Sequence, residues 1–94
     1  MALARVVTFE GVGSDRMDEM RRRMQEGERP DDLPASEILV LHDADDESAV
    51  VVVFFDNEED YARGDATLSA MPADDTPGRR AAVKKYDVAL RMSG

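Results

Sequence analysis

The sequence of 94 residues contains no cysteine and no tryptophan. Without cysteine, the chain has no disulfide bond, no thiol nucleophile and no thiolate metal site. It also lacks a run of the ~20 apolar residues that a membrane-spanning helix needs. Its N-terminal apolar run is interrupted by Arg5 and does not have the pattern of a secretory signal. We therefore predict a single cytoplasmic domain over residues 1–94 that does not bind a membrane.

Positive charge is scarce in the middle of the chain. Residues 31–75 carry fourteen acidic residues and only one base, Arg63, whereas residues 76–94 carry five bases and one acid. The net charge is −9, and such an acidic body repels phosphate backbones, so nucleic-acid binding is disfavoured. We interpret a small basic group near the C-terminus as a partner for the acidic middle rather than as a phosphate site. It consists of Arg79, Arg80, Lys84 and Lys85.

The signatures of common catalytic and nucleotide-binding sites are also missing. The sequence has no G-x-S-x-G, P-loop or G-x-G-x-x-G motif, so hydrolase, NTPase and dinucleotide functions lack support. His42 and the acids that follow it up to Glu47 form one cluster that resembles a metal site. This cluster lacks the central glycine and the spacing of a calcium loop, and we interpret it as a solvated hairpin tip. We predict no metal ion and no cofactor.

Residue patterns predict four strands and two helices in the order β-α-β-β-α-β. Runs rich in β-branched and aromatic residues predict strands at 2–10, 37–43, 48–56 and 79–92. The second and third strands are close enough in sequence to form a hairpin across the acidic turn at 44–47. This order is that of the ferredoxin-like α+β fold, with one four-stranded antiparallel sheet and both helices on one face.

The predicted helices occupy the two longer connections. The first is capped by Ser14 or Asp15 and runs to about Glu26. The second begins directly after the third strand, where Asp56 and Glu59 resemble a capping box. Leu33 lies in the polar loop after the first helix, and we expect it to pack against the core.

Helical spacing of apolar residues indicates which sides of the helices are buried. Gly64 costs ~1 kcal/mol of helix propensity, which indicates close backbone packing at that position. The Tyr61 hydroxyl needs a partner, which is either a strand carbonyl or a ligand. The stripe on the second helix consists of Tyr61, Gly64, Leu68 and Met71, and that on the first of Met17, Met20 and Met24.

The predicted sheet is apolar on both faces. Residues 38–41 and 49–55 are uninterrupted apolar runs, although two helices can cover only one face. At ~25 cal/mol per Å² of apolar surface, leaving the other face in water would cost several kcal/mol. A second copy of the chain is the simplest partner, so we predict a homodimer through the face opposite the helices. The fourth predicted strand adds an apolar face made of Tyr86, Val88, Leu90 and Met92.

Nearly the whole chain resembles the dimeric α+β barrel superfamily, which includes the antibiotic-biosynthesis monooxygenase domain. It is most similar to a set of short uncharacterised actinobacterial proteins of this fold. The resemblance is carried by the segments RVVTFEGV, LVLHD, VVFFDNEEDYARGDATLSAMP and TPGRRAAVKKYDVALRM. It implies that two copies pair their sheets into a barrel. Members of the superfamily range from oxygenases to haem-degrading enzymes and proteins with no known activity, so the resemblance defines the fold more closely than the chemistry.

Two functions are compatible with the predicted fold and homodimer. One is a non-enzymatic homodimer that binds a small apolar or aromatic molecule or serves as an assembly module. The other is a cofactor-independent monooxygenase or isomerase acting on an aromatic polyketide-like substrate. The monooxygenase members use a tryptophan and an asparagine around their pocket; here tryptophan is absent and no motif assigns Asn57 to that role, which favours the first function. The candidate ligand-binding residues are Arg5, His42, Tyr61 and Tyr86.

Overall fold

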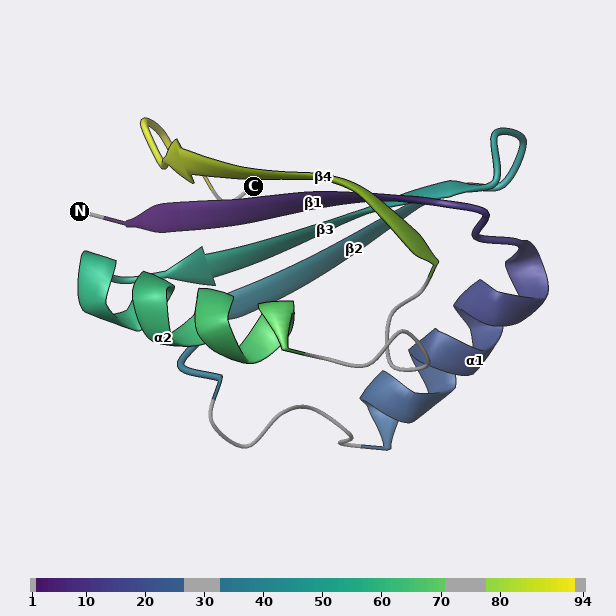
Figure 1. Ribbon diagram of the computed structural model, residues 1–94, viewed down its shortest axis with the longest axis horizontal. Coiled ribbons are helices and arrows are strands. Elements are labelled where there is room, and N and C mark those ends of the chain that lie inside the picture. Colours follow the sequence, from purple (N-terminus) through teal and green to yellow (C-terminus); the bar gives the residue numbers. More distant parts are fainter. Residues whose placement is uncertain (1, 27–32, 71–77, 93–94) are drawn as a thin grey trace.

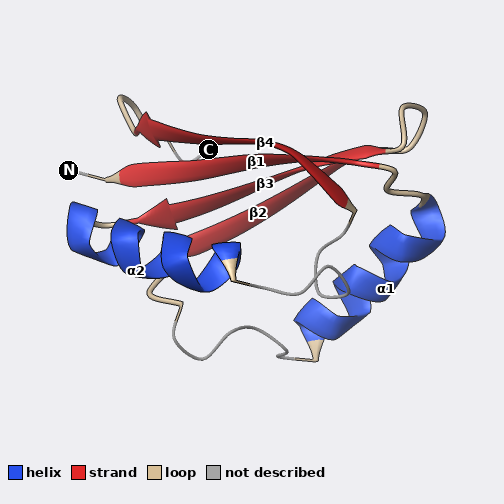
Figure 2. Ribbon diagram, in the orientation of Figure 1, coloured by secondary structure: helices blue, strands red, loops and turns tan. Residues whose placement is uncertain are grey.

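The computed structural model describes residues 2–26, 33–70 and 78–92. Within them, four strands and two helices follow one another in the predicted order (Figure 1). Both helices lie on the same side of the sheet (Figure 2). The elements are β1 (Leu3–Glu10), α1 (Ser14–Gln25), β2 (Glu37–Asp43), β3 (Ser48–Phe55), α2 (Glu58–Ser69) and β4 (Arg79–Asp87).

The four strands form one sheet in the order β2-β3-β1-β4. Each neighbouring pair is antiparallel, and β2 and β3 form the predicted hairpin. β1 and β3 therefore occupy the centre of the sheet, while β2 and β4 are its edges. This is an α+β fold with the strand order of the ferredoxin-like class, so the fold prediction is confirmed.

The register of the sheet determines which side chains share a face, because directly opposite residues point the same way. Arg5 of β1 lies opposite Val53 of β3 and Lys85 of β4, on the side that carries the helices. We call the other side the open face. Its side chains form four rows across the sheet: Glu37, Phe54, Ala4 and Tyr86; Leu39, Val52, Val6 and Lys84; Leu41, Val50, Thr8 and Ala82; and a polar row at the hairpin end, Asp43, Ser48, Glu10 and Arg79.

The hydrophobic core lies between the helices and the covered side of the sheet. It has two clusters, one around Phe55, which is fully buried, and one around Val12 and Val7. Leu33 belongs to the first cluster and is 7% exposed, so its predicted packing against the core is confirmed. Of the methionine stripe on α1, only Met17 is buried, whereas Met24 is 39% exposed. None of the helices in the described segments is long and apolar enough to cross a membrane.

Gly64 is buried and faces the sheet, as its position in the stripe predicts. A Cβ atom at this position would fall well inside van der Waals contact with the Phe55 ring. The missing side chain thus lets the α2 backbone approach the β3 side chain directly. Met71, the last member of the predicted stripe, lies outside the described residues.

The predicted helix caps are wrong by about one residue. The N-cap of α1 is Gly13, without a side-chain hydrogen bond, rather than Ser14 or Asp15. The N-cap of α2 is Asn57, whose Oδ1 accepts a hydrogen bond from the Asp60 backbone N–H at 2.8 Å. The capping box predicted from Asp56 and Glu59 is therefore not the cap. The physical reason is that β3 ends at Phe55 and α2 begins only at Glu58, which moves the capping position onto Asn57.

The fourth strand is shorter than predicted. β4 ends at Asp87, opposite Leu3, the first residue of β1. A strand that continued to residue 92 would have no partner, because β1 does not extend beyond Leu3. Of the four residues predicted to share a face, only Tyr86 is in the strand, and the face predicted from Val88, Leu90 and Met92 is wrong. Figure 1 shows the chain turning back after β4.

Candidate functional site

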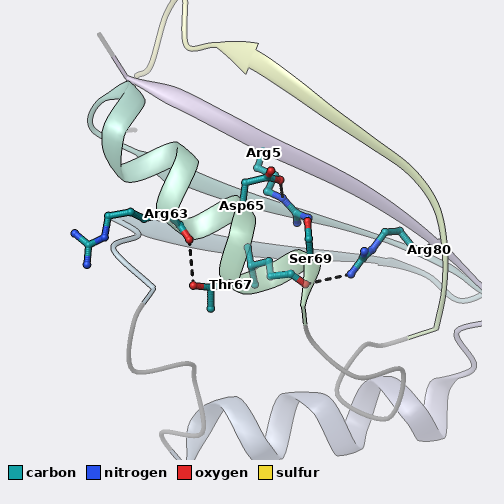
Figure 3. A network of polar contacts seen from close by, with 7 residues as sticks. Arg5, Arg63, Asp65, Thr67, Ser69 and Arg80 are labelled. Carbon is teal, nitrogen blue, oxygen red and sulfur yellow. Dashed lines mark hydrogen bonds and ion pairs between the residues drawn. The ribbon is translucent and has the colours of Figure 1, made fainter.

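Arg5 is a buried charge at the contact between α2 and the sheet. Arg5 is 3% exposed, and its Nε donates a hydrogen bond to Oδ1 of Asp65 at 2.8 Å. Its Nη2 also donates to Oγ of Ser69 at 3.4 Å, and both partners belong to α2 (Figure 3). The Asp65 side chain is 43% exposed, so the pair joins a buried guanidinium to a carboxylate that still contacts water.

Tyr61 lies one helical turn before Asp65 and is 8% exposed. Its ring packs edge-on against Phe55, with the ring centroids 5.4 Å apart. The ammonium nitrogen of Lys85 lies 4.9 Å from the centroid of the Tyr61 ring. Burial raises the pKa of the Tyr61 hydroxyl above its ordinary value, and the Asp65 carboxylate raises it further. Both effects favour the neutral phenol over the phenolate.

β4 contributes three cations beside α2 and β1. Lys85 donates to both carboxylate oxygens of Glu58, at 2.9 and 2.7 Å, and this hydrogen bonding raises the pKa of Lys85. Arg80 donates to the carbonyl oxygen of Leu68 at 3.2 Å, near the end of α2 (Figure 3). Arg79 forms an ion pair with Glu10. Of the basic group, Lys85 makes the predicted pair with the acidic middle of the chain, through Glu58, whereas the partner of Arg79 lies outside residues 31–75.

His42 is placed at the other end of the covered side. Its Nε2 lies 2.9 Å from the carbonyl oxygen of Val12, in the connection between β1 and α1. The following turn is exposed, and Oδ1 of Asp43 accepts a hydrogen bond from the Asp46 backbone N–H at 3.1 Å. Among the described residues, no group of three or more histidine and acidic side chains is arranged to hold a metal ion. His42 therefore connects the β2–β3 hairpin to the segment that precedes α1.

The structure does not bring the four candidate residues into one site. Arg5 and Tyr61 come together through α2, with Asp65 beside both. His42 lies in the row that includes Phe9 and Ala49, two rows of the sheet away from Arg5. Tyr86 is opposite Ala4 on the open face and is 48% exposed.

The polar partner that sequence reasoning missed is Asp65. A signal for it was present, because Asp65 follows Tyr61 by four residues and so lies on nearly the same side of the helix. Its acidic type suggested a solvated position in a segment already rich in acids. The deciding fact, a buried arginine at position 5 opposite α2, comes only from the tertiary arrangement.

The open face is the second feature that the structure defines. Leu39 and Leu41 are 41% and 56% exposed, and Val6, Val50, Val52 and Phe54 are half-buried. No other secondary-structure element of the described chain packs on this face. It therefore presents apolar side chains from its first three rows to the surroundings, and only the row at the hairpin end is polar.

Comparisons with protein-family models, with curated proteins and with solved structures found no match for this chain.

Proposed function

We propose that this chain is a homodimeric module without catalytic activity, in which two copies pack their open faces against each other. The observation that carries this proposal is the uncovered apolar face of the central sheet. A contiguous apolar surface of this kind marks an interaction site in soluble proteins. The same patch on two copies forms a self-complementary contact under two-fold symmetry, the commonest arrangement of homodimers.

The charges around the open face favour a second copy as the partner. The strand positions of the open face, together with Arg91 after β4, carry three acids, Glu10, Glu37 and Asp43, and three bases, Arg79, Lys84 and Arg91; the acidic turn at 44–47 lies beyond them. The face is thus neutral, although the whole chain carries a net charge of −9. Two neutral faces meet without the repulsion that two acidic surfaces would have. A basic partner would be attracted to the acidic remainder of the molecule rather than to this face.

The polar contacts on the covered side support a structural role for most of the candidate residues. Arg5 has its guanidinium engaged by Asp65 and Ser69, and the Tyr61 ring is packed between Phe55 and Lys85. A monooxygenase or isomerase would need its polar groups to converge on one substrate. Here the candidates are distributed over both faces of the sheet, so the assembly function is the better supported one.

Two adjacent residues of β2 offer a matched test. Leu39 and Val40 are 41% and 42% exposed, but Leu39 lies on the open face and Val40 on the covered side. In the proposed dimer, Leu39→Lys places a charge inside the interface, whereas Val40→Lys places it outside. Light scattering should therefore show dimers for the unmodified chain and for Val40→Lys, and monomers for Leu39→Lys. Dimers of Leu39→Lys as stable as those of the unmodified chain would overturn the proposed interface.

A further inference from the structure

The segment that follows β4 lies across one end of the open face. The backbone N–H of Val88 donates to the carbonyl oxygen of Ala2 at 3.0 Å, next to the last pair of the β1–β4 ladder. Further on, the Arg91 guanidinium carbon lies 4.5 Å from the centroid of the Phe54 ring, and Arg91 forms an ion pair with Glu37. Phe54 and Glu37 belong to the first row of the open face, on β3 and β2. Residues 88–92, which we call the C-terminal arm, therefore cross the sheet from β4 towards β2.

Two large apolar side chains of the C-terminal arm are exposed to solvent. Leu90 and Met92 are 79% and 83% exposed, and they flank Arg91, which is fixed by Phe54 and Glu37. Arg91 thus attaches the arm to the sheet, while Leu90 and Met92 make little contact with their own chain. Such side chains are ordinarily exposed singly, but here they stand together at the edge of an apolar face.

The area of the sheet supports a role for the arm. With strands ~4.8 Å apart and ~3.3 Å per residue, four strands of eight residues have a flat footprint of roughly 500 Å². A standard stable interface buries about 800 Å² on each partner. The flat area of the open face is therefore smaller than the area that a standard interface buries, and groups beside the face would increase the buried area. Leu90 and Met92 are the exposed apolar groups adjacent to it.

The most exposed large apolar side chain of the open face lies in its third row, next to the polar row at the hairpin end. Leu41 is 56% exposed, the largest exposed fraction of any large apolar residue in the strands. It lies four residues along β2 from Glu37, which corresponds to about 13 Å. The arm of the same chain is anchored at Glu37, at the opposite end of the face. Each copy thus has the exposed side chains of Leu90 and Met92 at one end of the open face and the exposed side chain of Leu41 towards the other end.

We propose that, in the homodimer proposed above, the C-terminal arm of each copy covers the Leu41 end of the other copy. Leu90 and Met92 of one subunit then contact Leu41 of its partner, and the two-fold axis repeats the contact at the opposite end. This inference rests on the sheet-to-sheet dimer and adds the relative orientation of the two copies. It also gives the Arg91 contacts with Phe54 and Glu37 a function, which is to hold the arm in position for the partner.

Cross-linking tests this orientation directly, because the chain contains no cysteine. Leu41→Cys and Leu90→Cys are made as separate single variants, one of them carrying a tag that changes its mass. The mixed dimers are treated with a short thiol-reactive cross-linker, and the products are separated by mass. We expect the covalent product to join the two different variants. Each variant alone should give little cross-linked dimer.

The alternative outcomes separate this inference from the proposed dimer. If the protein is a dimer but the Leu41→Cys variant cross-links to itself, or if no pair of variants cross-links, the orientation is wrong and the dimer stands. If the protein is a monomer, both proposals fail. As a second measurement, Leu90→Ser with Met92→Ser should raise the dimer dissociation constant at least about tenfold. Met24→Ser, at an apolar residue 39% exposed on α1, is the control and should leave it unchanged.

Discussion

The guanidinium of Arg5 on β1 is tied to the carboxylate of Asp65 on α2 by a hydrogen bond of 2.8 Å, and Arg5 is 3% exposed. The two residues are sixty positions apart in the sequence, and their contact joins β1, one of the two central strands, to α2. Because the charge on Arg5 is buried, it depends on its partners on α2 more than a surface arginine would.

Asp65→Ala should therefore destabilise the fold by about 1–3 kcal/mol, because it leaves a buried donor without its acceptor. The measurement is urea unfolding followed by circular dichroism. Asp18→Ala is the matched control, since the Asp18–Arg21 pair is 69% and 62% exposed in its side chains. Removing that pair should cost no more than about 1 kcal/mol. Equal costs for the two variants would show that the Arg5 contact contributes no more than a surface pair.

Gly64→Ala should destabilise the protein, although alanine is the better helix former by about 1 kcal/mol. The added Cβ meets the Phe55 ring, so either the ring or the helix must move. Phe55→Leu removes this ring, and Gly64→Ala should cost less in that background than in the unmodified chain. Thermal unfolding of the four proteins in this cycle measures the coupling. A Gly64→Ala variant more stable than the unmodified chain would mean that α2 does not approach β3 as closely as described.

Asn57→Ala should destabilise α2 by about 1 kcal/mol, because it removes the acceptor for the Asp60 backbone N–H. The adjacent Asp56→Ala is the control and should change the free energy of unfolding by no more than about 0.5 kcal/mol. Chemical denaturation of both variants gives the comparison. The reverse order of effects would place the cap on Asp56, as the capping-box pattern predicts.

The pKa of Tyr61 should lie above its ordinary value in the folded protein, because burial and the Asp65 carboxylate both disfavour the phenolate. In the Tyr86→Phe variant Tyr61 is the only tyrosine, so alkaline titration of tyrosinate absorbance reports it alone. The same variant unfolded in denaturant should titrate near ~10. The raised pKa means that the contribution of Tyr61 to stability is complete below this ordinary value and is lost as pH rises through the folded pKa. A folded pKa at or below the unfolded one would contradict the described environment.

The local parts of the fold could be predicted because they depend on residue spacing. The helical stripe places Gly64 against the sheet, and the apolar run 38–41 with its flanking residues predicts the strand at 37–43; the structure confirms both. The cap of α2 was misplaced because Asp56 and Asn57 are both good capping residues, and only the end of β3 decides between them. Such neighbouring alternatives are not separated by propensity alone.

The C-terminal arm and the Arg5 contact required the tertiary structure. The alternation of Tyr86, Val88, Leu90 and Met92 fits a strand, but a strand needs a partner, and β1 supplies none beyond Leu3. Likewise, the sequence showed Arg5 as an interruption of an apolar run without showing what lies opposite. The two-sided apolarity of β3 predicted one covered and one open face, and the covered face is confirmed by the burial of Val53 and Phe55.

The central claim is that the open face pairs with a second copy. The most direct measurement is the mass of the unmodified chain in solution, by light scattering at micromolar concentration. We expect twice the mass of the 10.4 kDa chain. A mass of one chain that persists as the concentration is raised would contradict the proposed dimer and, with it, the role of the C-terminal arm.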